Sequence, residues 1–246
     1  MTPIKLFCSD LDGTLLGNLE AMRRFNETWT RLSTPEGPIL CYNSGRLLDN
    51  MLELVQSKVL VRPDFIVGGV GSQLYDARKN QTIAEFEEHL QPGWDLAKVG
   101  QILKSFRGVM PQPPECLNPF KSSWYLYDAP EIVDAIRRCL ADAGINVKIV
   151  YSSGCDLDVL PANAGKGGAL QWLCHRIGIP LKDVLVAGDS GNDADMFLLP
   201  EVQGIVVENG HPELHTHLDH QRTFFATRPF ADGVLEGMEY FNLVPQ

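Results

Sequence analysis

Two aspartates two residues apart could carry out covalent chemistry on a phosphate group. Asp10 and Asp12 follow the apolar run at residues 4–8 and precede Gly13, which permits a tight turn. On an extended segment their side chains point to the same side, about 7 Å apart. One carboxylate can attack phosphorus to give an acyl phosphate, while the other protonates the leaving alkoxide and later deprotonates water. The spacing predicts Asp10 as nucleophile and Asp12 as acid and base; a turn with helix-capping aspartates is the alternative.

A second acidic loop runs from Gly188 to Asp193, directly after the apolar run at residues 184–187. Carboxylates at i and i+4 in a glycine-containing loop suit a hard cation, and Mg²⁺ usually takes one or two carboxylates together with phosphate and water. We predict that Asp10 and Asp189 bind this cation directly and that Asp193 orients a water molecule or a neighbouring group. A loop that merely caps the next helix is the alternative.

Two further segments could hold a phosphate group. Ser44 lies in the segment 43–46, which follows a predicted strand at residues 39–42 and opens a helix. Its hydroxyl and the nearby backbone N–H groups could bind phosphate oxygens. Lys166 stands at the start of a predicted helix, where a cation opposes the helix dipole and favours an anionic partner. A serine N-cap and a solvated lysine are the alternatives.

The elements around these residues alternate short apolar runs with amphipathic stretches, which is typical of βα units and a parallel sheet. Strands are predicted at residues 4–8, 39–42, 64–67, 184–187 and 204–207, and helices at residues 18–32, 165–177 and 231–241. In such a sheet, ligands bind at the carboxyl ends of the strands, so all four segments can face one crevice.

The middle of the chain follows another pattern. Helices are predicted at residues 94–106 and 130–143, and strands at residues 124–127, 147–151 and 157–160. Successive strands without helices between them indicate an antiparallel sheet with helices on one face. We therefore predict an α/β core domain formed by residues 1–76 plus 162–246, interrupted by a smaller α+β domain at residues 77–161.

The composition limits the partners of the chain. Its 246 residues are 44% hydrophobic, enough for a sizeable core, and the net charge of −10 makes it a poor partner for nucleic acid or an anionic membrane. The six cysteines form no C-x-x-C pair, and no signal peptide or membrane-spanning segment is evident, so we predict a cytoplasmic protein. An acidic chain that binds phosphate needs a metal ion, placed cations or helix N-termini at the site.

Taken in order, the D-x-D-G-T box, the serine after the second strand, the lone lysine and the G-D-x-x-x-D box resemble the haloacid-dehalogenase-like (HAD) phosphatases. The resemblance covers essentially the whole chain. It implies a Rossmann-like parallel-sheet core with an inserted C2-type cap domain, and Mg²⁺ as cofactor. The site it implies has Asp10 as nucleophile, Asp12 as acid and base, Ser44, Lys166 and Asn192 at the phosphate, and Asp10, Asp12 (through its backbone carbonyl), Asp189 and Asp193 at the metal.

A narrower resemblance is to the sucrose-phosphate phosphatase branch, and within it to mannosylfructose-phosphate phosphatase. It rests on the chain length and on the segments Gly69 to Ser72, Lys121 to Trp124, residues 151–161 and Asn209 to Leu214. Sucrose-type members tend to have glutamate where this chain has Gln73, and an amide hydrogen-bonds a sugar hydroxyl differently. The sugar contacts that the resemblance implies are Gly45, Arg46, Gly71, Gln73, Lys121 and Asp158, with Trp124 and Asp156 as further cap candidates.

Together these features predict a Mg²⁺-dependent phosphatase that hydrolyses a disaccharide phosphate, mannosylfructose-phosphate or sucrose 6-phosphate, through an aspartyl-phosphate. Its expected partner is the small sugar phosphate, and its expected state is a monomer. Two alternatives stay open: a sugar phosphomutase or phosphotransferase that passes the phosphate to another hydroxyl, and a non-catalytic sugar-phosphate-binding protein. The intact carboxylates count against the last, because a pure binder would gain from losing closely placed negative charges.

Overall fold

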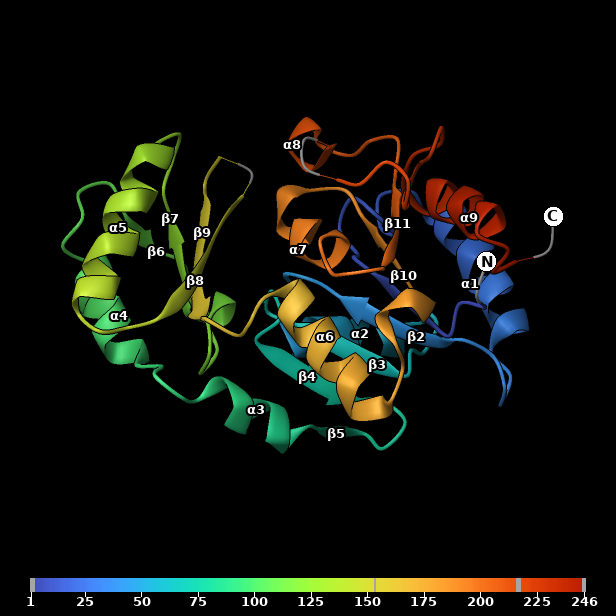
Figure 1. The fold of residues 1–246 in the computed structure, drawn as a ribbon, viewed down its shortest axis with the longest axis horizontal. Helices are drawn as coiled ribbons and strands as arrows, with labels where there is room; N and C mark the ends of the chain where they lie inside the picture. Colours follow the sequence, from blue (N-terminus) through green and yellow to red (C-terminus); the bar gives the residue numbers. More distant parts are fainter. Residues whose placement is uncertain (1–2, 153, 216–217, 245–246) are drawn as a thin grey trace.

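The β-strands form two sheets (Figure 1). The computed structural model describes residues 3–152, 154–215 and 218–244, so Ser153 lies outside the described residues. The larger sheet contains β1 (Leu6–Ser9), β2 (Ile39–Asn43), β3 (Phe65–Gly68), β4 (Gln73–Asp76), β5 (Gln81–Thr82), β10 (Val184–Gly188), β11 (Gln203–Val206) and β12 (Thr223–Phe225). Their order is β12-β11-β10-β1-β2-β3-β4-β5.

The strands from β11 to β3 pair in parallel, as the βα rhythm predicted, and β12, which was not predicted, adds a further parallel strand beside β11. The last two pairs, β3–β4 and β4–β5, are antiparallel and were not predicted. The chain reverses between β3 and β4 through Gly69, Val70 and Gly71, whose φ angles of 57°, 57° and 82° form a tight left-handed turn. Because β5 belongs to the larger sheet, that sheet continues to Thr82, past residue 77 where the smaller domain was predicted to begin.

Helices cover both faces of the larger sheet. One face carries α1 (Leu19–Leu32), α2 (Leu48–Gln56) and α9 (Phe230–Tyr240), and the other carries α3 (Ala84–Leu90), α6 (Lys166–Ile177) and α7 (Ala194–Phe197). Side chains alternate along β1, so Phe7 packs against Phe25 and Trp29 of α1, whereas Leu6 and Cys8 face the α6 side. Figure 1 shows α1 and α9 side by side at the end of the molecule away from the smaller sheet.

The smaller sheet has the order β6-β7-β9-β8 and is antiparallel throughout. Its strands are β6 (Met110–Pro111), β7 (Ser122–Tyr125), β8 (Val147–Ser152) and β9 (Asp156–Pro161), and its helices are α4 (Leu96–Leu103) and α5 (Pro130–Asp142). Trp124 of β7 and Leu157 and Val159 of β9 pack with Ile136 and Leu140 of α5. The predicted antiparallel sheet with helices on one face is therefore present.

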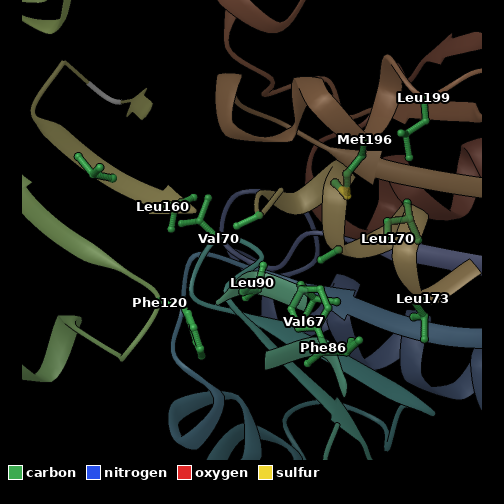
Figure 2. Packing of buried hydrophobic residues seen from close by; sticks show 14 of the residues in the cluster. Val67, Val70, Phe86, Leu90, Phe120, Leu160, Leu170, Leu173, Met196 and Leu199 are labelled. Carbon is green, nitrogen blue, oxygen red and sulfur yellow. The ribbon is translucent and has the colours of Figure 1, made fainter. Parts of the chain in front are cut away.

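One apolar cluster links the two sheets. It includes Leu170 and Met196 on the α6 side of the larger sheet and reaches Val70, Phe120 and Leu160 (Figure 2). The remaining short helices are α8 (Pro212–His215) and three 3₁₀ turns, Pro114–Cys116, Leu181–Asp183 and Gly191–Asp193. Among the described residues, no helix combines the length and apolar character that crossing a membrane requires.

Candidate active site

Three of the predicted residues lie at the carboxyl ends of neighbouring parallel strands. Asp10 follows β1, Ser44 follows β2 and Asp189 follows β10. Because β1 pairs with both β2 and β10, these ends meet at one edge of the larger sheet. Asp10, Ser44 and Asp189 are all buried, with exposed fractions of 4%, 0% and 5%. The structure therefore brings three distant segments to a single edge, as the strand positions predicted.

Lys166 joins this edge from the start of α6. Its Nζ donates to Asp10 Oδ1 at 2.7 Å and to Asp193 Oδ1 at 2.6 Å, and the lysine is fully buried. Gly165 precedes it with a φ of 102°, a conformation that L side chains rarely adopt. The helix therefore begins by turning a lysine into the sheet edge, where two carboxylates compensate its charge.

The charges at this edge do not balance. Burial raises the pKa of Asp10 well above its ordinary value, and Asp193 and Asp189 add to the rise, although Lys166 opposes it. Burial also lowers the pKa of Lys166, but Asp10 and Asp193 outweigh this effect, so the net pKa is raised and the lysine stays protonated. Full ionisation of the three carboxylates would leave two negative charges in excess of the one ammonium, and the raised pKa of Asp10 opposes this. A divalent cation would neutralise them.

The oxygen donors fit such a cation. Oxygens of Asp10, Asp189 and Asp193 lie within 4.8 Å of one another. Asp193 uses Oδ1 for Lys166 and accepts at Oδ2 from the backbone N–H groups of Asp189 and Ser190, both at 3.1 Å. With both oxygens engaged, Asp193 orients its neighbours, which leaves Asp10 and Asp189 as the carboxylates suited to direct binding.

Two residues that the sequence reasoning did not single out hold the Asp189 side of the site. Thr14 Oγ1 donates to Asp189 Oδ1 at 3.0 Å, and Asn209 Nδ2 donates to the backbone oxygen of Gly13 at 2.7 Å. A Cβ atom at Gly13 would lie 2.3 Å from Asp189 Oδ2, so only glycine allows this close approach. Thr14 belongs to the D-x-D-G-T box, and Asn209 belongs to the segment Asn209 to Leu214, which resembles the sucrose-phosphate phosphatases.

Asp12 lies at the mouth of the site in an ion pair. The Arg46 guanidinium donates to both Asp12 oxygens, at 2.6 and 2.7 Å, and both side chains are partly exposed. This hydrogen bond raises the pKa of Arg46, while partial burial opposes it. A two-point pair of this kind fixes the position of the Asp12 carboxylate beside Asp10.

A pocket of about 330 Å³ opens between this edge and the smaller sheet. The larger sheet's side contributes Asp10, Asp12, Ser44, Gly45, Arg46, Leu47, Asn50, Val70, Ser190 and Asn192, and the smaller sheet's side contributes Gln112, Glu115, Cys116, Lys121, Ser152, Asp156 and Asp158. The predicted residues Gly45, Arg46, Asn192, Lys121 and Asp158 thus share one pocket with Asp10.

A buried ion pair forms the polar floor on the smaller sheet. Lys121 Nζ lies 3.3 Å from Asp158 Oδ1, and Ser123 Oγ donates to the same carboxylate at 2.6 Å. Burial raises the pKa of Asp158, and Lys121 and Ser123 oppose the rise. Gln112, which the sequence reasoning missed, donates to Asp156 at 2.8 Å. Its place follows from β6, whose two residues are too short to predict as a strand.

Three predicted sugar contacts lie elsewhere. Gly71 packs on the chain before α6, where a Cβ would lie 2.1 Å from the Gly165 oxygen. Gln73 accepts from the backbone N–H of Leu48 at 3.0 Å and so caps α2. Trp124 is buried on the opposite face of the smaller sheet, where α5 packs. None of these three residues lines the pocket, so the structure gives no support to their predicted contact with the sugar.

Replacing Lys166 with methionine is expected to lower the free energy of unfolding by about 3 kcal/mol or more, because two buried carboxylates lose their counter-charge. Denaturant unfolding in metal-free buffer measures this. The matched control is Arg137→Met, which breaks a pair with Asp134 in which both side chains are exposed (55% and 70%), and should cost less than about 1 kcal/mol. Equal stability of Lys166→Met and wild type would contradict the burial argument.

Comparison with known proteins identifies the family. The model of the sucrose-6F-phosphate phosphohydrolase family matches residues 3–242. The chain belongs to this family. It is 41% identical over 249 residues to the mannosylfructose-phosphate phosphatase of Agrobacterium fabrum, and the match covers both chains in full. It is 31% identical to sucrose-phosphatase 1 of Nicotiana tabacum over 98% of its own length, which spans 60% of the plant protein.

Solved structures share the fold of this sucrose-6F-phosphate phosphohydrolase family member. The sucrose-phosphatase of Synechocystis sp. PCC6803, solved with sucrose and phosphate, superposes with a TM-score of 0.89 at 30% identity, covering 98% of this chain and 99% of that one. A HAD subclass IIB sugar phosphatase superposes with a TM-score of 0.69 at 14% identity, which shows the fold alone. The predicted HAD fold and the sucrose-phosphate phosphatase branch are confirmed, and the chain is a phosphoric monoester hydrolase.

Proposed function

We propose that this protein is a Mg²⁺-dependent phosphatase that hydrolyses a disaccharide phosphate through an aspartyl-phosphate on Asp10. The observation that carries the proposal is the shared pocket. It joins a buried carboxylate cluster containing one lysine to a polar floor on the smaller sheet. The first part suits a phosphate and the second suits sugar hydroxyls.

The phosphate is held by groups at the sheet edge. Ser44 and the backbone N–H groups that follow it donate to phosphate oxygens, and Lys166 supplies a positive charge beside Asp10. Asn192 lines the pocket with a buried side-chain atom, Oδ1, that lacks a partner among the described residues. This atom is an acceptor, so it suits a water molecule, and a rotation of the amide that exchanges Oδ1 and Nδ2 would present N–H donors to the phosphate. Asp10, Asp189 and the Asp12 backbone carbonyl would hold Mg²⁺, which would neutralise negative charge on the phosphate.

Two displacements complete the reaction. A carboxylate oxygen of Asp10 attacks phosphorus, the bond from phosphorus to the sugar oxygen breaks, and Asp12 gives its proton to that oxygen. Asp12 then takes a proton from water, whose oxygen attacks phosphorus and displaces Asp10, which releases inorganic phosphate. In the free protein both Asp12 oxygens accept from Arg46, so this pair opens and Asp12 takes up a proton before the first transfer.

A disaccharide phosphate is the substrate class we propose. Two relatives support it by name, a mannosylfructose-phosphate phosphatase at 41% identity and a sucrose-phosphatase at 31%. The polar floor adds physical support, because the charged groups of Lys121, Asp158 and Asp156 offer several partners for sugar hydroxyls. The smaller domain, predicted at residues 77–161, would select the sugar while the larger one carries out the chemistry.

A phosphate-release screen tests the proposal. Mannosylfructose-phosphate, sucrose 6-phosphate, trehalose phosphate and hexose monophosphates are compared at equal enzyme concentration. The expected result is the highest kcat/KM for mannosylfructose-phosphate or sucrose 6-phosphate, with phosphate released in proportion to substrate. Transfer of phosphate to a second hydroxyl without release would favour the phosphomutase, and binding without turnover would favour the non-catalytic binder.

A further inference from the structure

Two stacked tyrosines continue the pocket floor outward on the smaller sheet. The rings of Tyr125 and Tyr127 lie 5.9 Å apart between centroids, with an interplanar angle of 16°. Tyr127 is 57% exposed. Exposed aromatic rings that lie together on a protein surface often mark a binding site. The phosphate chemistry described above has no role for this pair.

The strand register and the ring contact place both tyrosines on the pocket side of the sheet. Side chains alternate along β7, so Ser123 and Tyr125 share one face and Trp124 is buried on the other. Tyr127 lies two residues past the end of β7 and stacks on Tyr125, so it lies on the same side. Ser123 donates to Asp158, which lines the pocket, and this fixes which face is which.

The neighbouring strand confirms the continuity. Ser123 lies opposite Asp158 and Tyr125 lies opposite Asp156 in the antiparallel register. Asp156 and Asp158 both line the pocket. Neither tyrosine lines the pocket itself, but this face of the sheet runs from the buried Lys121–Asp158 pair through Asp156 to the tyrosine rings just beyond the pocket.

Resting on the proposed function, we propose that Tyr125 and Tyr127 bind the sugar ring of the substrate that lies farther from the phosphate. A pyranose ring presents a face of C–H groups that packs on an aromatic ring, while its hydroxyls reach neighbouring polar groups. Asp156, held by Gln112, supplies such an acceptor beside Tyr125. The pair acts in ground-state binding and selects disaccharide phosphates over monosaccharide phosphates.

Alanine variants of the two tyrosines test this assignment. Tyr127→Ala and the double variant with Tyr125→Ala are expected to raise KM for the preferred disaccharide phosphate about tenfold, with kcat within about twofold of wild type. KM for a hexose 6-phosphate, which lacks the second ring, should not change. Tyr127→Phe should retain wild-type KM, because the ring face and not the hydroxyl makes the contact.

The matched control is Tyr240→Ala. Tyr240 is 56% exposed and stacks on Phe224 at 4.6 Å, but it lies on α9, away from the smaller sheet (Figure 1). It should leave KM for both substrates unchanged. If the double variant leaves the disaccharide KM unchanged, or raises both KM values equally, the assignment is overturned, and an interface with another protein would explain the exposed rings instead.

A failure of the proposed phosphatase function would give a different result from a failure of the tyrosine assignment. In that case wild type would release no phosphate from any disaccharide phosphate, whatever the variants do. Calorimetric binding of the unphosphorylated disaccharide then still tests the tyrosines, because Tyr127→Ala should weaken this binding about tenfold while Tyr240→Ala should not. Equal binding by wild type and Tyr127→Ala would overturn the assignment without reference to turnover.

Discussion

Replacing Asp10 with asparagine is expected to lower kcat by a factor of about 10⁴ or more, because an amide cannot attack phosphorus as a carboxylate does. The fold should persist, since Lys166 keeps Asp193 as its partner at 2.6 Å. Far-UV circular dichroism and cooperative denaturant unfolding check the fold, and phosphate release checks the rate. The change of one oxygen to nitrogen leaves the packing around residue 10 almost unaltered.

Asp183→Asn provides the control for this result. Asp183 is as buried as Asp10, with exposed fractions of 3% and 4%, and it also pairs with a lysine, Lys5. It stands at the start of β10, however, at the opposite end of the sheet from the pocket. Asp183→Asn should therefore keep wild-type kcat. Substantial turnover by Asp10→Asn would show that the nucleophile is another group or that water attacks the substrate directly.

Removing divalent metal with a chelator is expected to reduce turnover at least about 10³-fold, because ionising the three carboxylates then leaves negative charge in excess where the phosphate must bind. Added Mg²⁺ should restore the rate. Ca²⁺ should not, since it takes more ligands at longer distances than two carboxylates and a carbonyl arrange. The measurement is the rate of phosphate release against free metal concentration.

The variant Thr14→Val tests whether Asp189 takes part in metal binding. The variant removes the hydrogen bond that orients Asp189 and keeps the side-chain volume, so it should raise the Mg²⁺ concentration for half-maximal rate about tenfold or more. Thr30→Val is a suitable control, because Thr30 Oγ1 donates to the backbone carbonyl of Asn26 on the surface of α1, away from the pocket. Full activity of the chelated wild type, or equal Mg²⁺ dependence in Thr14→Val, would contradict the metal site.

The elements that position the site were largely predictable because their signals are local. The apolar run at residues 184–187 predicted β10, observed at Val184–Gly188, and the helical spacing predicted α6 to within one residue. Strand-end positions then brought Asp10, Ser44 and Asp189 to one edge, since parallel strands align their carboxyl ends. The spacing of motifs along strands therefore predicts location well.

Contacts between distant segments could not be predicted in the same way. The Lys166–Asp193 pair and the Arg46–Asp12 pair depend on rotamers chosen after the loops meet. Gln73 was predicted to contact the sugar. However, the N-cap residue of α2, Leu47, has no polar side chain, and Gln73 Oε1 accepts from the Leu48 N–H instead. The antiparallel edge at β4 was not predicted because only four residues, 69–72, reverse the chain between β3 and β4, where a βα unit would place a helix.

Mass spectrometry of the enzyme quenched in acid during turnover detects a covalent phosphate on Asp10. With mannosylfructose-phosphate or sucrose 6-phosphate and Mg²⁺ present, we expect a phosphoryl group on the peptide that contains Asp10, and none in Asp10→Asn. A phosphoryl group on a peptide without residue 10, or turnover with no phosphorylated enzyme at any quench time, would contradict the aspartyl-phosphate mechanism.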